Sequence, residues 1–142
     1  MKVDHFDITA RARKKYTFAL EPVCRQWDLT KNELDVLLFL HNNPEYDRAA
    51  DIVAHRGMTK SHVSLSVTNL ERRGLLRRSE DPEDRRAVHL KLTDEAQVIA
   101  DAGKECQVRF FSAMFDGLSR EDVLFWQSLM DRVCDNIDRM DG

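Results

Sequence analysis

The chain has 142 residues, 42% of them hydrophobic, which suits a single domain (1–142) with a core of its own. No apolar run reaches the roughly 20 residues that cross a bilayer, and the N-terminal segment is charged where a signal peptide is apolar, so we expect a cytoplasmic protein without a membrane partner. The net charge of −3 argues against a uniformly basic nucleic-acid binder, and three scattered cysteines argue against a disulfide framework or a thiolate zinc site.

The first two helices are predicted from apolar spacing and from a capping signal. A long helix is expected over residues 4–27, where large apolar side chains recur every three or four residues. These are Tyr16, Leu20, Val23 and Trp27. Thr30 and Glu33 have the spacing of a capping box, so a second helix begins after Thr30 and ends before Pro44.

Two short helices joined by a tight turn come next. The first is predicted over residues 48–56, capped by Asp47 and ended by Gly57, and its inward-facing residues are expected to be Ala50, Val53 and Ala54. The second begins after Thr59 and ends at Gly74, and its buried stripe is Val63, Val67 and Leu70. Two such helices around a glycine-containing turn are typical of a helix-turn-helix.

The periodicity changes after Gly74. Residues 75–78 and 88–92 are predicted strands, the second with alternating apolar and polar residues, and the polar segment 79–87 between them is turn-forming. These segments form a β-hairpin, the wing. A long helix follows from 93–95 to about residue 115, and after a break at 117–119 a last helix has apolar residues at steps of three and four.

The predicted fold is therefore mainly α with a small β-hairpin wing (α+β). A winged helix-turn-helix occupies residues 30–93, between long terminal helices at 4–27 and 94–140. Charge is uneven along this chain: the segment 55–91 has nine Lys and Arg against five Asp and Glu, whereas the remainder is acidic. A basic segment in an acidic body suits a protein that presents one face to a polyanion, although a solvated surface can have the same composition.

Residues 69–78, 81–87 and 90–96 are three motifs in register along the predicted helix-turn-helix and wing. They resemble the MarR family of bacterial regulators, and the resemblance covers essentially the whole chain. Residues 69–78 (NLERRGLLRR) are similar to the end of that family's recognition helix and its first wing strand. Residues 81–87 (DPEDRRA) are similar to its wing tip, and residues 90–96 (LKLTDEA) to the entry into its fifth helix. The resemblance implies a homodimer that binds double-stranded DNA at a pseudo-palindromic operator, usually as a repressor released by a small-molecule effector.

The dimer implied by the resemblance has its own support in the terminal helices. They carry more large apolar surface than one small winged module can cover, in Trp27, Phe110, Phe111, Phe115, Phe125 and Trp126. The alternative is that these side chains only complete an intrachain core.

The expected DNA contacts come from the recognition helix and the wing. An α-helix fits the major groove, and the polar side of the predicted helix holds Lys60, Ser61, His62, Ser64 and Thr68. Generic phosphate-binding candidates are Arg72, Arg73, Arg77 and Arg78, although a helix C-terminus also favours cations. The alternative for these residues is an ordinary solvated surface.

At the wing tip, a guanidinium can enter a narrow minor groove. The family resemblance assigns this role to Arg86, whereas Arg85 is expected on phosphate. Asp84 is expected to orient Arg78 or Arg86 through a bidentate salt bridge. The alternative is an exposed, mobile charge cluster.

Sensing residues are harder to predict. By the resemblance, Tyr16 and Trp27 are candidates to line an effector cleft, against the alternative of core packing. Cys24 is a candidate redox sensor, against an inert helix residue. The histidines show no metal-ligand spacing, so no metal or cofactor is expected.

Two other classes of function are weighed against the regulator. A winged module used only for protein–protein contact would leave the arginines incidental. An enzyme has little support, because the sequence has no glycine-rich phosphate loop, nucleophile elbow or paired carboxylates.

Overall fold

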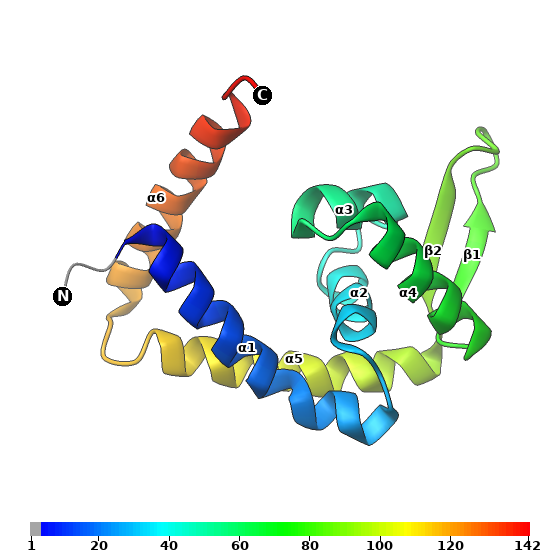
Figure 1. The fold of residues 1–142 in the computed structure, drawn as a ribbon, viewed down its shortest axis with the longest axis horizontal. Coiled ribbons are helices and arrows are strands. Elements are labelled where there is room, and N and C mark those ends of the chain that lie inside the picture. Colours follow the sequence, from blue (N-terminus) through cyan, green and yellow to red (C-terminus); the bar gives the residue numbers. More distant parts are fainter. Residues whose placement is uncertain (1–3) are drawn as a thin grey trace. The chain divides into compact units, whose positions relative to one another are not determined.

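The computed structural model describes residues 4–142, and its elements follow the predicted order (Figure 1). They are α1 (His5–Trp27), α2 (Lys31–Asn42), α3 (Ala49–Arg56), α4 (Lys60–Arg72), β1 (Leu76–Glu80), β2 (Val88–Leu92), α5 (Asp94–Met114) and α6 (Arg120–Asp138). The mainly helical fold with a small antiparallel wing is confirmed. Within the described residues, no helix is long and apolar enough to span a membrane. The chain divides into one unit that ends at Val108 and a second, Arg109–Gly142.

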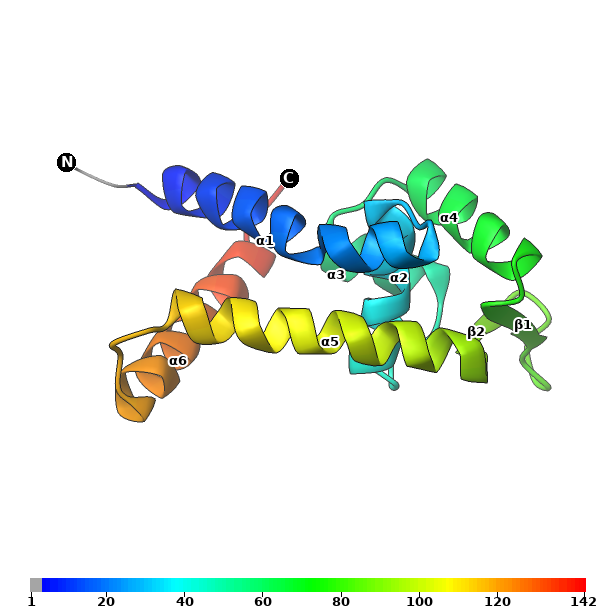
Figure 2. The same ribbon diagram turned by 90° about the horizontal axis from the view of Figure 1, so that it is seen from below.

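Helix α2 forms the centre of the first unit's core. Every apolar side chain from Leu34 to Leu40 is buried, and the predicted capping box of Thr30 and Glu33 starts the helix. The residues that pack around it are Leu20, Val23, Ile52, Val63, Val67, Leu70, Leu75, Leu76, Leu90, Ala96, Ile99 and Cys106. Helix α5 approaches α2 at Gly103, where a Cβ would lie 2.9 Å from a methyl carbon of Leu38. Both views show α3 and α4 beside α2 (Figures 1 and 2).

The helix-turn-helix differs from the prediction in two details. Arg48, not Asp47, is the N-cap of α3, because the Asp51 carboxylate accepts a hydrogen bond of 3.1 Å from the Arg48 backbone N–H. The buried residue of α3 is Ile52, which the sequence analysis did not assign to the core. The expected core residues Ala50 and Ala54 are exposed instead and, with Val53, line an open groove of about 460 Å³ that also borders α4 and the wing. The glycine that ends α3, Gly57, has the expected left-handed φ of 63°.

The wing begins directly after α4. Strand β1 pairs with β2 in antiparallel register, from Leu76 opposite Leu92 to Glu80 opposite Val88, so it extends two residues beyond the predicted 75–78. Thr93 fastens the base of the hairpin, since its hydroxyl donates to the Gly74 carbonyl (2.9 Å) and its backbone N–H to the Leu75 carbonyl (3.2 Å). Figure 1 shows the tip projecting away from the helices.

The second unit contains the end of α5 and the whole of α6. Ser119 and Asp122 form a capping box that the sequence analysis missed, and hydrogen bonds from Ser119 lower the pKa of the Asp122 carboxyl. Phe115 and Trp126 make an edge-to-face contact with their ring centroids 5.0 Å apart. No residue of α6 is buried, so its predicted apolar stripe is open to solvent within a single chain.

Candidate nucleic-acid interface

Helix α4 presents a polar face to solvent. Thr59 caps it by accepting a hydrogen bond from the His62 backbone N–H (3.1 Å), as predicted. The opposite side is buried through Val63, Val67 and Leu70, with Ser66 also enclosed. Of the predicted contacts, four are exposed and one, Thr68, is half-buried; the exposed four are Lys60, Ser61, His62 and Ser64. Helix α4 is therefore packed against the core on one side and exposed to solvent on the other.

Two adjacent arginines at the end of α4 have different environments. Arg73 donates to the backbone carbonyls of Trp27 and Asp28, both at 2.6 Å, and so ties the end of α4 to the end of α1. Asp28 ends α1 with a left-handed φ of 51°, which directs the chain into α2. Arg72 is exposed and keeps the role of a phosphate-binding candidate. The sequence alone did not separate the two.

This difference predicts opposite phenotypes for two neighbouring variants. Arg73→Ala leaves two backbone carbonyls without their charged donor, and we expect a loss of about 1–2 kcal/mol in the free energy of unfolding. Arg72→Ala is expected to change stability by less than about 0.5 kcal/mol but to weaken DNA binding and reduce its salt dependence. Urea unfolding and DNA titrations at several salt concentrations measure both. Equal stability of the two variants would contradict the assignment.

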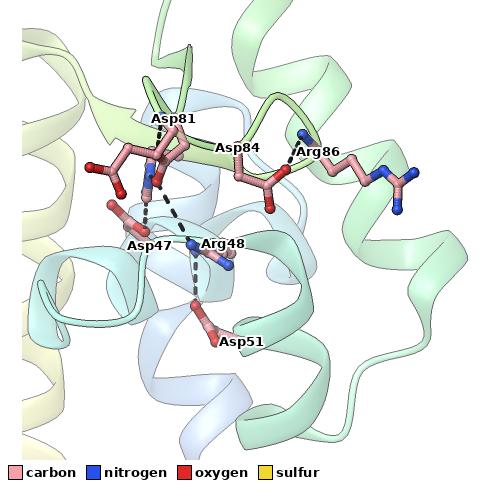
Figure 3. A network of polar contacts seen from close by, with 8 residues as sticks. Asp47, Arg48, Asp51, Asp81, Asp84 and Arg86 are labelled. Atoms are coloured by element: carbon pink, nitrogen blue, oxygen red, sulfur yellow. Dashed lines mark hydrogen bonds and ion pairs between the residues drawn. The ribbon is translucent and has the colours of Figure 1, made fainter.

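Wing arginines also differ in their partners. The Arg78 guanidinium pairs with Glu71 of α4, with its Nε 2.8 Å from Oε2. Asp84 accepts a hydrogen bond of 3.0 Å from the backbone N–H of Arg86, and the Arg86 side chain points away from it (Figure 3). The prediction of a bidentate salt bridge from Asp84 to Arg78 or Arg86 is therefore wrong. The Asp84 carboxylate instead accepts a hydrogen bond from the backbone of the turn. Arg77, Arg85 and Arg86 are exposed.

A cluster of charged residues holds the wing against the segment that precedes α3. His89 of β2 makes two contacts, from Nδ1 to Asp47 (2.8 Å) and from Nε2 to Asp81 (2.9 Å). Arg48 lies 4.0 Å from the same Asp81 oxygen, and the Leu90 backbone N–H donates to the Asp47 carbonyl at 2.7 Å. Asp47, Arg48 and Asp81 meet in Figure 3. We call His89 with Asp47 and Asp81 the wing clamp.

The wing clamp requires a protonated imidazole. Ionised carboxylates only accept hydrogen bonds, so both ring nitrogens of His89 must donate. The bond to Asp47, followed by the bond to Asp81, raises the pKa of His89 above its ordinary 6.5. In turn, His89 is the main group that lowers the pKa of Asp81 below 3.8. Stability from His89 is complete below 6.5 and is lost as pH rises through its folded pKa, whereas stability from Asp81 is lost as pH falls below 3.8.

The clamp therefore predicts a pH-dependent phenotype. His89→Gln is expected to lower the melting temperature most between about pH 4 and 6.5, and the difference from wild type should shrink at higher pH. Asp47→Asn, which removes one carboxylate charge, should move this loss to lower pH. Thermal unfolding from pH 4.5 to 9 measures both variants. A stability difference between wild type and His89→Gln that stays constant over this range would show that the clamp does not depend on the imidazolium.

A cavity of about 530 Å³ lies in the first unit, bordered by α1, α2, the α3–α4 turn and Gln107 of α5. Gln107 donates to the Tyr16 hydroxyl (2.7 Å), and burial raises the pKa of Tyr16. The Lys31 ammonium lies 4.8 Å from the centre of the Tyr16 ring. Tyr16 thus lines a cavity, as the effector hypothesis requires.

This cavity also adjoins the start of helix α4. Thr59, the N-cap of α4, lines it together with His62 and the cationic side chain of Arg56. Trp27 does not line it but packs on the hydrophobic core, so the core alternative is favoured for Trp27. Burial raises the pKa of Asp35, another lining residue, whose carboxylate lies 2.5 Å from the Lys31 ammonium.

Cys24 is in a protected environment. It is half-buried against the core, and burial raises the pKa of its thiol. Because the thiolate is the reactive form, this environment does not favour the redox hypothesis. Over residues 4–142, no group of three His, Cys, Asp or Glu side chains has an arrangement that could hold a metal ion.

Comparisons with known proteins agree with this geometry. The sequence model of the MarR family matches residues 27–87. The HTH-type transcriptional regulator FarR of Neisseria gonorrhoeae is 26% identical over 121 residues, which cover 84% of this chain and 82% of that protein.

Two solved structures share the fold. A putative MarR family transcriptional regulator from Listeria monocytogenes, crystallised with a 26mer DNA, has a TM-score of 0.82 at 17% identity and covers 96% of this chain and 90% of that chain. BpsR of Bordetella bronchiseptica, whose structure concerns regulation of DNA binding by 6-hydroxynicotinic acid, has a TM-score of 0.70 at 21% identity. That match covers 93% of this chain and 94% of the other.

Proposed function

Because the sequence model of the MarR family matches residues 27–87, we propose that the chain is a MarR-family transcriptional regulator that binds a pseudo-palindromic operator as a homodimer and represses transcription until an effector releases it. Regulation, not catalysis, is the activity of its relatives. The observation that carries the proposal is that α4 is buried on one side and exposes a polar side, next to a wing whose tip exposes Arg85 and Arg86. We place this activity in the cytoplasm.

In this proposal residues 30–93 contact DNA, and residues 4–27 and 94–140 form the dimer. The exposure of apolar side chains in a single chain supports the proposed dimer. On α1, Phe6 is 80% exposed and Phe18 is 73% exposed, and the apolar stripe of α6 is also exposed to solvent. Such apolar surface favours association with a second chain. An isologous dimer then presents two recognition helices to half-sites about 10 bp apart.

The effector is proposed to bind in the cavity lined by Tyr16. This cavity reaches Thr59 and His62 at the start of α4, so an occupant that contacts them differently in two states shifts the position of the recognition helix. Tyr16 and Phe39 supply aromatic surface. The lining cations Arg13, Lys31 and Arg56 outnumber the lining carboxylate Asp35, which pairs with Lys31, so the cavity suits a small aromatic anion. BpsR, with 6-hydroxynicotinic acid, is a structural relative with a ligand of this type.

Binding to DNA flanking the protein's own gene, and to sites selected from random duplexes, tests the proposal. We expect saturable binding that survives nonspecific competitor and weakens by about 10³-fold or more between 50 and 200 mM salt, as six or more phosphate contacts are screened. If no site is found by either route, the protein is not a sequence-specific regulator, and a protein-interaction module becomes the better hypothesis.

A further inference from the structure

One large apolar side chain interrupts the polar face of α4. Leu65 is 61% exposed, although α4 buries its other large apolar residues Val63, Val67 and Leu70. The DNA contacts predicted from the sequence of α4 are all polar or charged, and Leu65 is not among them. The proposed polar contacts of α4 with DNA therefore do not explain the exposure of Leu65.

Helical geometry places Leu65 in the middle of the exposed side. With 3.6 residues per turn, Ser61, Leu65, Thr68 and Arg72 form one row along α4, opposite the buried stripe. Ser61 is four residues before Leu65, and Thr68 is three residues after it. Both neighbours are short, so the leucine side chain projects beyond them.

The position of this row limits what Leu65 can touch. If α4 enters the major groove, the row that contains Ser61 and Arg72 faces the DNA. A leucine can neither donate nor accept a hydrogen bond, so it cannot bind phosphate or a polar base edge. In the major groove, the apolar group that a base presents is the C5-methyl of thymine.

We infer that Leu65 is a specificity-determining residue that packs on a thymine methyl group in each half-site. This inference rests on the proposed function, because it requires α4 in the major groove. Guanine, cytosine and adenine present no C5-methyl there, so Leu65 selects for thymine at one symmetric pair of positions. Removal of one buried methyl is expected to weaken binding about fourfold, and removal of both about 15-fold.

The test uses the full-length protein and a site selected from random duplex DNA. Each thymine in the site is replaced in turn, in both half-sites, by uracil, which lacks only the methyl group. We expect one pair of replacements to weaken wild-type binding by about 15-fold, whereas Leu65→Ala should bind the thymine and uracil duplexes equally. The thymine duplex measured beside each uracil duplex is the control, because the two duplexes differ only in the methyl group.

Each outcome has a clear meaning. Circular dichroism checks that Leu65→Ala is folded, which its exposed position favours. Specific binding that is indifferent to every uracil replacement, or an equal response of wild type and Leu65→Ala, overturns the assignment of Leu65 but leaves the proposed function standing. Failure to select any site overturns the proposed function itself and this inference with it.

Discussion

Substitution of both Leu129 and Val133 of α6 by aspartate is expected to convert the proposed dimer to a monomer of 16.5 kDa and to weaken operator binding by at least about 10²-fold. Both side chains belong to the apolar stripe that a single chain leaves open, at 38% and 43% exposure. In the dimer, an unpaired carboxylate there would be removed from water at high cost. A monomer holds only one half-site, so it loses the gain in affinity from the tethered second half-site.

Light scattering after size exclusion measures the mass, and anisotropy titration measures affinity for the operator. Ser128→Asp is the matched control, because it adds the same charge to the polar side of α6 and should leave both quantities unchanged. Helical content by circular dichroism separates dissociation from unfolding. A double variant that remains a dimer would show that α6 is not in the interface.

Arg86→Ala is expected to weaken operator binding by about 30-fold or more, because the proposed dimer would lose two proposed minor-groove contacts of roughly 1–3 kcal/mol each. The structure leaves the Arg86 side chain exposed at the wing tip, and its backbone N–H is held by Asp84. Substitution therefore removes the guanidinium without disturbing the turn. The effect should be largest on operators with a narrow, A·T-rich groove at the wing position.

Arg85→Ala is the neighbouring control for this experiment. It is expected to weaken specific and nonspecific DNA similarly and to reduce the salt slope, as loss of a phosphate contact does. Asp84→Ala removes the hydrogen bond to the Arg86 backbone N–H. We therefore expect it to weaken operator binding indirectly, by altering the turn that positions Arg86. If Arg85→Ala and Arg86→Ala have the same sequence-independent effect, Arg86 is only a phosphate ligand.

Local signals predicted most of the element boundaries. Thr30 and Thr59 start helices through side-chain hydrogen bonds to residues three positions later, and such bonds depend only on neighbouring sequence. The glycines at 57 and 74 have positive φ for a similarly local reason. The start of α3 was predicted wrongly. The Asp47 carboxylate could either cap the helix or bond to a distant side chain, and it bonds to His89, 42 residues away.

The prediction of individual roles failed where long-range partners decide them. Arg72 and Arg73 are equivalent in sequence, yet only Arg73 reaches the carbonyls at the end of α1. Trp27 and Tyr16 have the same helical spacing, yet only Tyr16 lines the cavity. Leu65 was not predicted as a contact because only polar side chains of this helix were candidates for DNA binding, whereas its exposure is set by which side of α4 is buried.

The sequence by itself determined the resemblance to the MarR family, the order of elements and the candidate DNA-binding residues of α4 and the wing, because caps, turns and periodicity act over a few residues. Only the tertiary structure decided which charged groups hold the fold together and which stay free for DNA. Contacts such as the wing clamp join segments far apart in the chain, and their energies depend on distances and burial that no local pattern contains.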